Sequence, residues 1–170
     1  MQSIDRRQLS DIARPAELRD MRTLALPLRV ESIFSAEFLR LDSIIPQSQR
    51  QKLILGLDAE DVLAAPDLFL LARHFAKARG YRLMLEAASP FAATVVSSLR
   101  GGFDFLRLKW SEEFPGADSA ATAELSKKLA QASEHVVLAG ADRPAAIAWG
   151  WEAGIRLFQG RLIESQRPAS

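Results

Sequence analysis

The chain has 170 residues, of which 48% are hydrophobic and 25% are charged, the composition of an ordinary soluble globular protein. Its 22 basic and 21 acidic residues are mixed along the whole length, so no basic stripe is available for a nucleic-acid backbone. The sequence contains no cysteine, which excludes disulfides, thiol nucleophiles and cysteine zinc sites and is compatible with a reducing cytoplasm.

The N-terminal stretch, residues 1–21, mixes charges with scattered aliphatic residues and lacks the apolar core of a signal peptide. Pro15 interrupts it, so the pattern predicts a short helical segment or linker with one apolar side. No apolar run in the sequence approaches the ~20 residues that cross a bilayer. We therefore expect a cytoplasmic protein that interacts with neither membranes nor nucleic acid.

After this segment, short runs of β-type residues alternate with longer segments of helical spacing. The expected strands cover 23–26, 53–57, 81–85, 103–108, 135–138 and 155–158. Strands separated by crossover helices are typical of a parallel sheet. A closed (β/α)8 barrel needs eight strands and about 250 residues. The sequence thus predicts an α/β fold, an incomplete (β/α) barrel-like domain of about six parallel strands over residues 22–164, preceded by the short helical segment and followed by a disordered tail, 165–170.

Apolar spacing predicts helices over 68–79, 91–99 and 144–151. Gly80 is expected to cap the first helix, and Gly154 to stop the third. Asp142 is the expected N-cap of the third helix, with Pro144 in its first turn.

Several short stretches have counterparts, in the same order and spacing, in one protein family. Residues 35–39 read Ser-Ala-Glu-Phe-Leu, residues 103–109 read Phe-Asp-Phe-Leu-Arg-Leu-Lys, and residues 136–142 read Val-Val-Leu-Ala-Gly-Ala-Asp. Together with 53–58, 78–86 and 154–161, they resemble the last six strands of the EAL-type cyclic di-GMP phosphodiesterases. The resemblance covers about residues 24–163 and implies that the strand bearing the Glu-Ala-Leu motif has no counterpart here.

What the resemblance implies for chemistry depends on the strand-end residues. The family hydrolyses cyclic di-GMP with Mg or Mn held by carboxylates and one Asn, oxygen ligands that hard cations prefer. Four of the matching positions carry no side-chain oxygen: Pro27, Gly56, Ala87 and Ala139.

The remaining matching positions keep polar side chains. They are Glu86, Arg107, Asp142 and Gln159. Arg107 stands where the family has a Lys, and it cannot act as a base because a guanidinium stays protonated. We interpret these residues as a vestigial ligand-binding set without a metal site or a catalytic residue.

The resemblance and the lost positions together predict a catalytically inactive EAL-like domain, not an enzyme, that needs no cofactor and acts as a signalling or protein-interaction module. An incomplete barrel leaves sheet edges and apolar faces to be covered. We therefore expect a protein partner or self-association as a homodimer.

Other functions stay open and rank below this one. The first is a cyclic di-GMP sensor without hydrolysis, in which Glu86, Arg107 and Gln159 would face one pocket. The second is a metal-dependent phosphodiesterase. An enzyme of different chemistry would have to draw on Asp58, Glu60, Glu86 and Asp142.

Five tryptophan and histidine positions complete the candidates. Trp149 and Trp151 lie two apart on one expected helix and therefore point to different faces, which makes them interface candidates. Trp110 follows a strand end. We expect it to cover the pocket from which the family's ligand side chains have been lost. His74 and His135 have no converging ligand in the sequence and are expected on the surface. The acidic run 58–61 is expected to favour a helix N-terminus.

Overall fold

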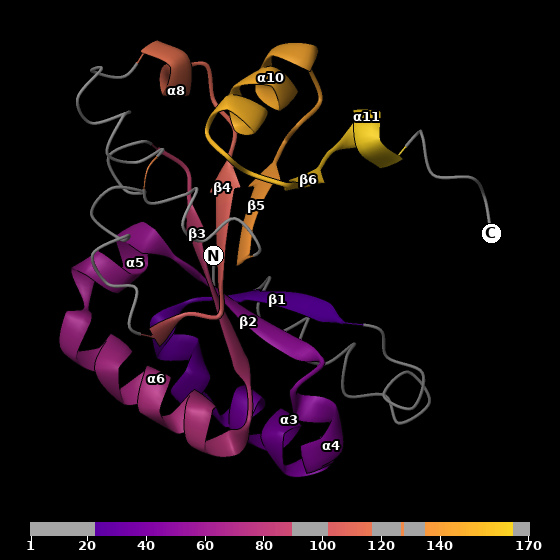
Figure 1. Cartoon of the computed structure of the whole chain (residues 1–170). Coiled ribbons are helices and arrows are strands. Elements are labelled where there is room, and N and C mark those ends of the chain that lie inside the picture. Colours follow the sequence, from indigo (N-terminus) through magenta and orange to yellow (C-terminus); the bar gives the residue numbers. More distant parts are fainter. Residues whose placement is uncertain (1–22, 90–101, 117–126, 128–134, 165–170) are drawn as a thin grey trace. The chain divides into compact units, whose positions relative to one another are not determined.

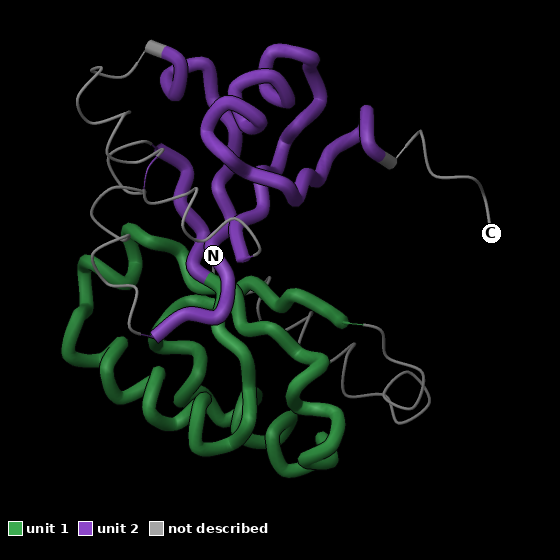
Figure 2. The backbone as a smooth tube through the Cα atoms, in the orientation of Figure 1, with its two compact units in different colours: residues 1–84 green, residues 85–170 purple. Residues whose placement is uncertain are grey.

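The computed structural model describes residues 23–89, 102–116, 127 and 135–164 (Figure 1). The chain divides into two compact units, residues 1–84 and residues 85–170 (Figure 2). Within the described residues, no helix is long and apolar enough to span a bilayer.

All six expected strands are present, each within about two residues of its expected bounds. They are β1 (Leu24–Leu28), β2 (Leu53–Asp58), β3 (Arg82–Ala87), β4 (Phe105–Lys109), β5 (Val136–Ala139) and β6 (Leu157–Gln159). The sheet order is β1-β2-β3-β4-β5-β6, which follows the order along the chain and leaves the sheet open. The expected fold class, an incomplete α/β barrel of parallel strands alternating with helices, is confirmed.

In the first unit, β1 and β2 pair in parallel, from Leu24 opposite Leu53 to Leu28 opposite Leu57. Helical segments cover the alternate, apolar residues of these strands, and Leu53, Leu55 and Leu57 are fully buried. These segments are the 3-10 helix η1 (Val30–Phe34) and the helices α3 (Ala36–Ile44), α4 (Gln47–Arg50), α5 (Ala59–Ala64) and α6 (Pro66–Arg79).

Helix α6 is the longest described helix, and its ends follow the expected chemistry. Pro66 occupies the first turn, where a missing N–H costs nothing. Gly80 ends the helix with φ +86°, a left-handed conformation that glycine adopts without a steric penalty. The predicted C-cap is therefore confirmed.

The second unit contains α8 (Glu113–Gly116), α10 (Pro144–Glu152) and α11 (Arg161–Glu164) beside β4, β5 and β6. Helix α10 packs closely on the sheet, because a Cβ on Gly150 would lie 2.6 Å from Phe158 Cε1 and 3.0 Å from Leu138 Cδ2. The predicted helix over 144–151 is confirmed, and the helix predicted over 91–99 lies outside the described residues.

The expected N-cap of α10 is wrong. Arg143, not Asp142, occupies the N-cap position, and no side chain caps the helix there. The carboxylate of Asp142 instead accepts a hydrogen bond from the backbone N–H of Arg161 at 2.7 Å. Asp142 therefore joins two loops that follow neighbouring strands, a role that no local pattern signals.

Candidate functional site

The polar side chains expected at the strand ends come together on the second unit. Arg107, on β4, donates from Nη1 to Glu86 Oε2 of β3 at 3.0 Å and from Nε to Gln159 Oε1 of β6 at 3.3 Å. About three tenths of the Arg107 and Glu86 side chains are exposed, so the cluster is half-buried and open to solvent. We call these three residues the Arg107 cluster.

Strand register explains how this cluster forms. Ala139 of β5 lies opposite Lys109 of β4 and Gln159 of β6, so these positions share one face of the sheet, the face of Arg107. The methyl side chain of Ala139 leaves room for Arg107 to reach Gln159 across β5. Ala139 is a position that was expected to have lost a carboxylate. The Arg107 guanidinium extends over this residue.

The charges of the cluster are largely satisfied within it. Glu86 and Arg107 form an ion pair with a charge-assisted hydrogen bond, the stronger kind of polar contact. A carboxylate paired to a guanidinium offers little net negative charge to a metal cation. Nη2 of Arg107 has no partner among the described residues, and it remains able to donate to an anion.

Asp142 does not share a hydrogen bond with this cluster within the described part of the chain. It holds the Arg161 N–H at 2.7 Å and the Arg161 Nε at 3.9 Å. The loops after β5 and β6 approach closely here, because a Cβ on Gly160 would lie 2.8 Å from the backbone of Ala141. Asp142 therefore stabilises the junction of two loops.

Two of the four positions without a ligand lie in the first unit. Pro27 and Gly56 are opposite each other in the β1–β2 register, and neither carries an oxygen on its side chain. Ala87 ends β3 and is buried, as is Ala139 at the end of β5.

The acidic residues after β2 form hydrogen bonds that stabilise the local structure. Asp58 Oδ1 accepts from the N–H groups of Glu60 at 2.8 Å and Asp61 at 3.3 Å, which makes Asp58 the N-cap of α5. Asp61 Oδ2 accepts from the Val30 N–H at 2.6 Å, and its Oδ1 lies 3.4 Å from Arg29 Nη2. The interpretation of this run as helix N-terminal charge is confirmed.

The two histidines lie on the surface, as expected. His74 is exposed on α6, and His135 is exposed just before β5, with its ring centroid 6.0 Å from that of Phe105. Among residues 23–89, 102–116, 127 and 135–164, no three His, Asp or Glu side chains are grouped so as to hold a metal ion.

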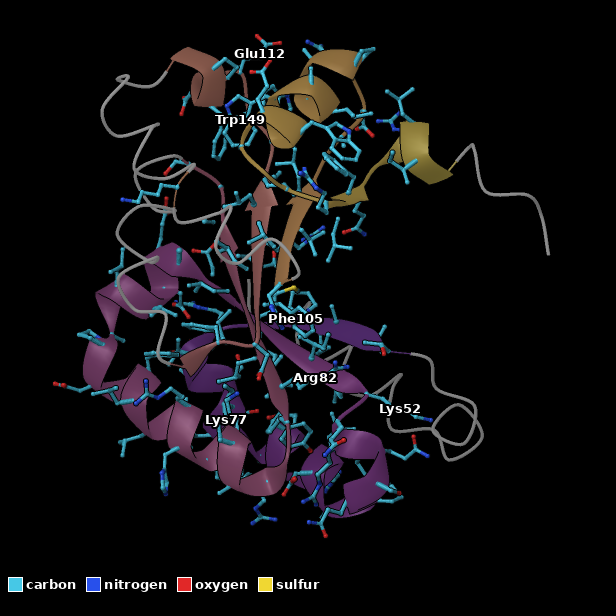
Figure 3. The ribbon with its side chains drawn as sticks, viewed as in Figure 1. Lys52, Lys77, Arg82, Phe105, Glu112 and Trp149 are labelled. Carbon is cyan, nitrogen blue, oxygen red and sulfur yellow. The ribbon has the colours of Figure 1, made fainter. Side chains whose placement is uncertain are left out.

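The tryptophans form two different environments, as the two-residue spacing predicts. Trp149 projects from α10 on the side of α8 (Figure 3) and contacts Trp110 and Phe114, with ring centroids 5.5 and 5.0 Å away. Trp151 is 54% exposed on another face of α10. Trp110 lies against Phe114 and Trp149, so it belongs to an aromatic cluster beside the end of β4.

Two residues that contribute to these environments were not singled out from the sequence. Phe114, in α8, is 1% exposed at the centre of the aromatic cluster. Arg156 stacks on Trp151, with the guanidinium carbon 4.9 Å from the ring centroid. The five-residue separation across a helix end carries no periodic signal, so only the fold brings this pair together.

The open sheet of parallel strands defines an incomplete α/β barrel, with a polar cluster at its strand ends. No protein-family model matches the sequence, and no match was found among curated proteins. Solved structures do match, and EAL domains are among them. The chain therefore has an EAL-like fold.

Three of these structures illustrate the similarity. Vibrio cholerae LapD, solved as S helix-GGDEF-EAL without ligand, is 13% identical with a TM-score of 0.69 over 95% of this chain and 41% of its own. Klebsiella pneumoniae BlrP1, in a manganese and cyclic di-GMP complex, is 17% identical with a TM-score of 0.66 over 94% of this chain and 43% of its own. The Xanthomonas citri FimX EAL domain, in complex with cyclic di-GMP, is 13% identical with a TM-score of 0.62 over 93% of this chain and 67% of its own. This chain therefore spans about two fifths of the length of the LapD and BlrP1 chains.

Proposed function

We propose that this chain is a non-catalytic module of cyclic di-GMP signalling, built on an EAL-like fold and acting through protein contacts. The observation that supports this most directly is the Arg107 cluster, in which the retained Glu86 carboxylate is paired to a guanidinium 3.0 Å away. The proposal assigns residues 22–164 to the module and the cytoplasm as its location.

The donor set of this chain does not fit the divalent metals that the EAL-like fold implies. Mg and Mn bind several oxygen ligands, mostly carboxylates, waters and carbonyls. Pro27, Gly56, Ala87 and Ala139 offer none from their side chains, and Asp142 is held by Arg161. These residues therefore do not support metal-assisted hydrolysis.

A second candidate, binding of cyclic di-GMP without hydrolysis, has one observation in its favour. Arg107 keeps Nη2 without a partner among the described residues, and Arg is suited to phosphate because it donates in a planar fork. The BlrP1 and FimX structures contain cyclic di-GMP, which makes this nucleotide the ligand to test. We rank the sensor below the protein-contact module because Glu86 and Gln159 already engage the guanidinium.

The first test is calorimetric titration with cyclic di-GMP, with and without Mn, combined with chromatographic detection of linear product. We expect no hydrolysis in either condition, because the site lacks metal ligands. We also expect no saturable heat at micromolar protein, because Glu86 and Gln159 already engage the Arg107 guanidinium. Hydrolysis that depends on Mn would contradict the proposal.

The variant Arg107→Ala separates the two candidates if binding does appear. Loss of the heat signal in Arg107→Ala, with retention in Arg143→Ala, would establish the sensor. Arg143 is the matched control because it is an exposed arginine of the same unit that is paired to Glu112 on the surface. Equal binding by both variants would exclude the Arg107 cluster as the binding site.

A further inference from the structure

Strand β1 ends the sheet and therefore has a free edge. It is the first strand in the order β1-β2-β3-β4-β5-β6, and within the described residues it pairs with β2 alone (Figure 1). A free strand edge carries backbone N–H and C=O groups without partners, and these groups pair readily with a strand of another chain. The edge of β1 is therefore a template for strand addition unless something blocks it.

The hydrogen-bonding register shows which backbone groups of β1 face this edge. The Leu24 N–H donates to the Lys52 carbonyl at 2.8 Å, so the backbone groups of Leu24 point toward β2. Backbone groups of successive strand residues point to opposite sides of the strand. Every second residue from Leu24 therefore bonds toward β2. The two residues in between, Ala25 and Pro27, direct their backbone groups to the free edge.

Pro27 removes one of the two N–H groups that the five residues of β1 direct to this edge, because proline has no backbone N–H. At a position that faces β2, a proline would cost a hydrogen bond of the ladder, whereas at the free edge it costs none. An arriving strand finds the N–H of Ala25 and then meets the exposed pyrrolidine ring of Pro27 in place of the next donor.

The sequence around Pro27 is one that pairs with copies of itself when nothing interrupts it. Residues 23–28 read Thr-Leu-Ala-Leu-Pro-Leu, an uncharged and mostly apolar run between Arg22 and Arg29. Leu24, within this run, is 39% exposed. Short apolar windows without charge tend to form intermolecular sheets, and a proline at a position that makes no ladder hydrogen bond interrupts such a window.

The other edge of the sheet is protected by its length. Strand β6, Leu157–Gln159, has three residues. Very short edge strands offer too few backbone groups for stable pairing with another chain. The five-residue β1 is the longer of the two edge strands, so it is the edge that needs a specific barrier.

We propose that Pro27 closes the free edge of β1 to strand addition by another chain, so that the open sheet ends at this strand. Pro27 stands at one of the four positions without a side-chain ligand, and it acts here through its missing N–H. A protein partner or a second copy then contacts helices and apolar faces and does not extend the sheet at β1. This role belongs to the sheet edge and does not depend on cyclic di-GMP binding or hydrolysis.

The test compares Pro27→Val with Ala25→Val in the full chain. Both variants place a valine side chain at the same edge, but only Pro27→Val restores the missing N–H. Thioflavin fluorescence and sedimentation velocity at matched protein concentrations measure the formation of β-rich assemblies. We expect wild type and Ala25→Val to remain free of them, and Pro27→Val to assemble at a rate at least about tenfold above both.

Circular dichroism checks that each variant is folded before assembly begins. Pro27→Ala restores the N–H with a smaller side chain and takes the place of Pro27→Val if that variant does not fold. Hydrogen exchange on the assembled variant locates the contact, and we expect the amide at position 27 to be protected. A Pro27→Val protein that assembles no faster than Ala25→Val, or an assembly in which the amide at position 27 exchanges freely, would overturn the proposal.

Discussion

Asp42 is the centre of a buried network of charged and polar side chains in the first unit. It is the buried charged residue of the described chain, 3% exposed within α3. Its carboxylate accepts from Arg79 at 2.8 Å and from the Tyr81 hydroxyl at 3.0 Å, and Arg50 lies 3.2 Å away. A buried carboxylate is tolerated because these donors replace its water, and the network ties α3 and α4 to the end of α6 and the start of β3.

This network changes the pKa of the Tyr81 hydroxyl. Burial, reinforced by the Asp42 carboxylate, raises the pKa of Tyr81 above its ordinary value of 10.0. The unfolded chain therefore loses the phenol proton at lower pH than the folded chain. The stabilisation is complete below pH 10 and declines as the pH rises above it.

Tyr81 is the single tyrosine of the sequence, so phenolate absorbance reports it alone. We expect no phenolate signal from folded protein at a pH slightly above 10.0, and a normal titration near 10.0 in denaturant. We also expect the free energy of unfolding to fall with pH above this value in wild-type protein, and to fall less in Tyr81→Phe. A folded-state titration at the ordinary pKa would contradict the buried network.

At the scale of elements, the sequence pattern predicts a helix correctly where its face and its ends depend on neighbouring residues of the same segment. Apolar periodicity and Gly80 predicted α6, because a helix face and its C-terminal cap are readable within one segment. Asp142 is not the cap of α10, because Arg143 occupies the N-cap position and the Asp142 carboxylate accepts from the Arg161 N–H instead. The position of α10 on the sheet depends on Gly150, whose significance is also invisible locally.

Gly150→Ala tests this packing. Alanine is the better helix former by about 1 kcal/mol. A Cβ at 2.6 Å from Phe158 nevertheless forces ring or helix to shift, and overpacking of this kind costs about 1–3 kcal/mol. We expect a net loss of stability in urea denaturation.

The control for this variant is Ala148→Gly on an exposed position of the same helix. It should lose about 1 kcal/mol through helix propensity alone. A Gly150→Ala variant more stable than wild type would show that α10 is not held against Phe158 as described.

For the whole molecule, self-association and stability are linked. A partner that binds only the folded chain raises stability by about 2.7 kcal/mol when its concentration is 100-fold above the dissociation constant. In a chain of this length, 1 kcal/mol shifts Tm by about 2–4 °C. Self-association, which the incomplete barrel leads us to expect, thus predicts a melting temperature that depends on protein concentration.

We expect the Tm of wild-type protein to rise by several degrees when its concentration is raised about 100-fold from the low micromolar range. Calorimetric scans at matched heating rates measure this rise. A Tm that stays constant over the same range would contradict self-association.

The sequence by itself was enough to predict the six strands, the parallel α/β class and the resemblance to EAL domains, because strand alternation, helix caps and motif spacing are local properties of the chain. It also identified Glu86, Arg107 and Gln159 as candidates. Only the tertiary structure decided that these three meet, over separations of 21 and 52 residues, while Asp142 binds Arg161 instead. It likewise decided that Asp42 meets Tyr81 and that Arg156 stacks on Trp151. Such contacts follow from strand register and from how helices pack on the sheet, and neither is encoded in any single segment.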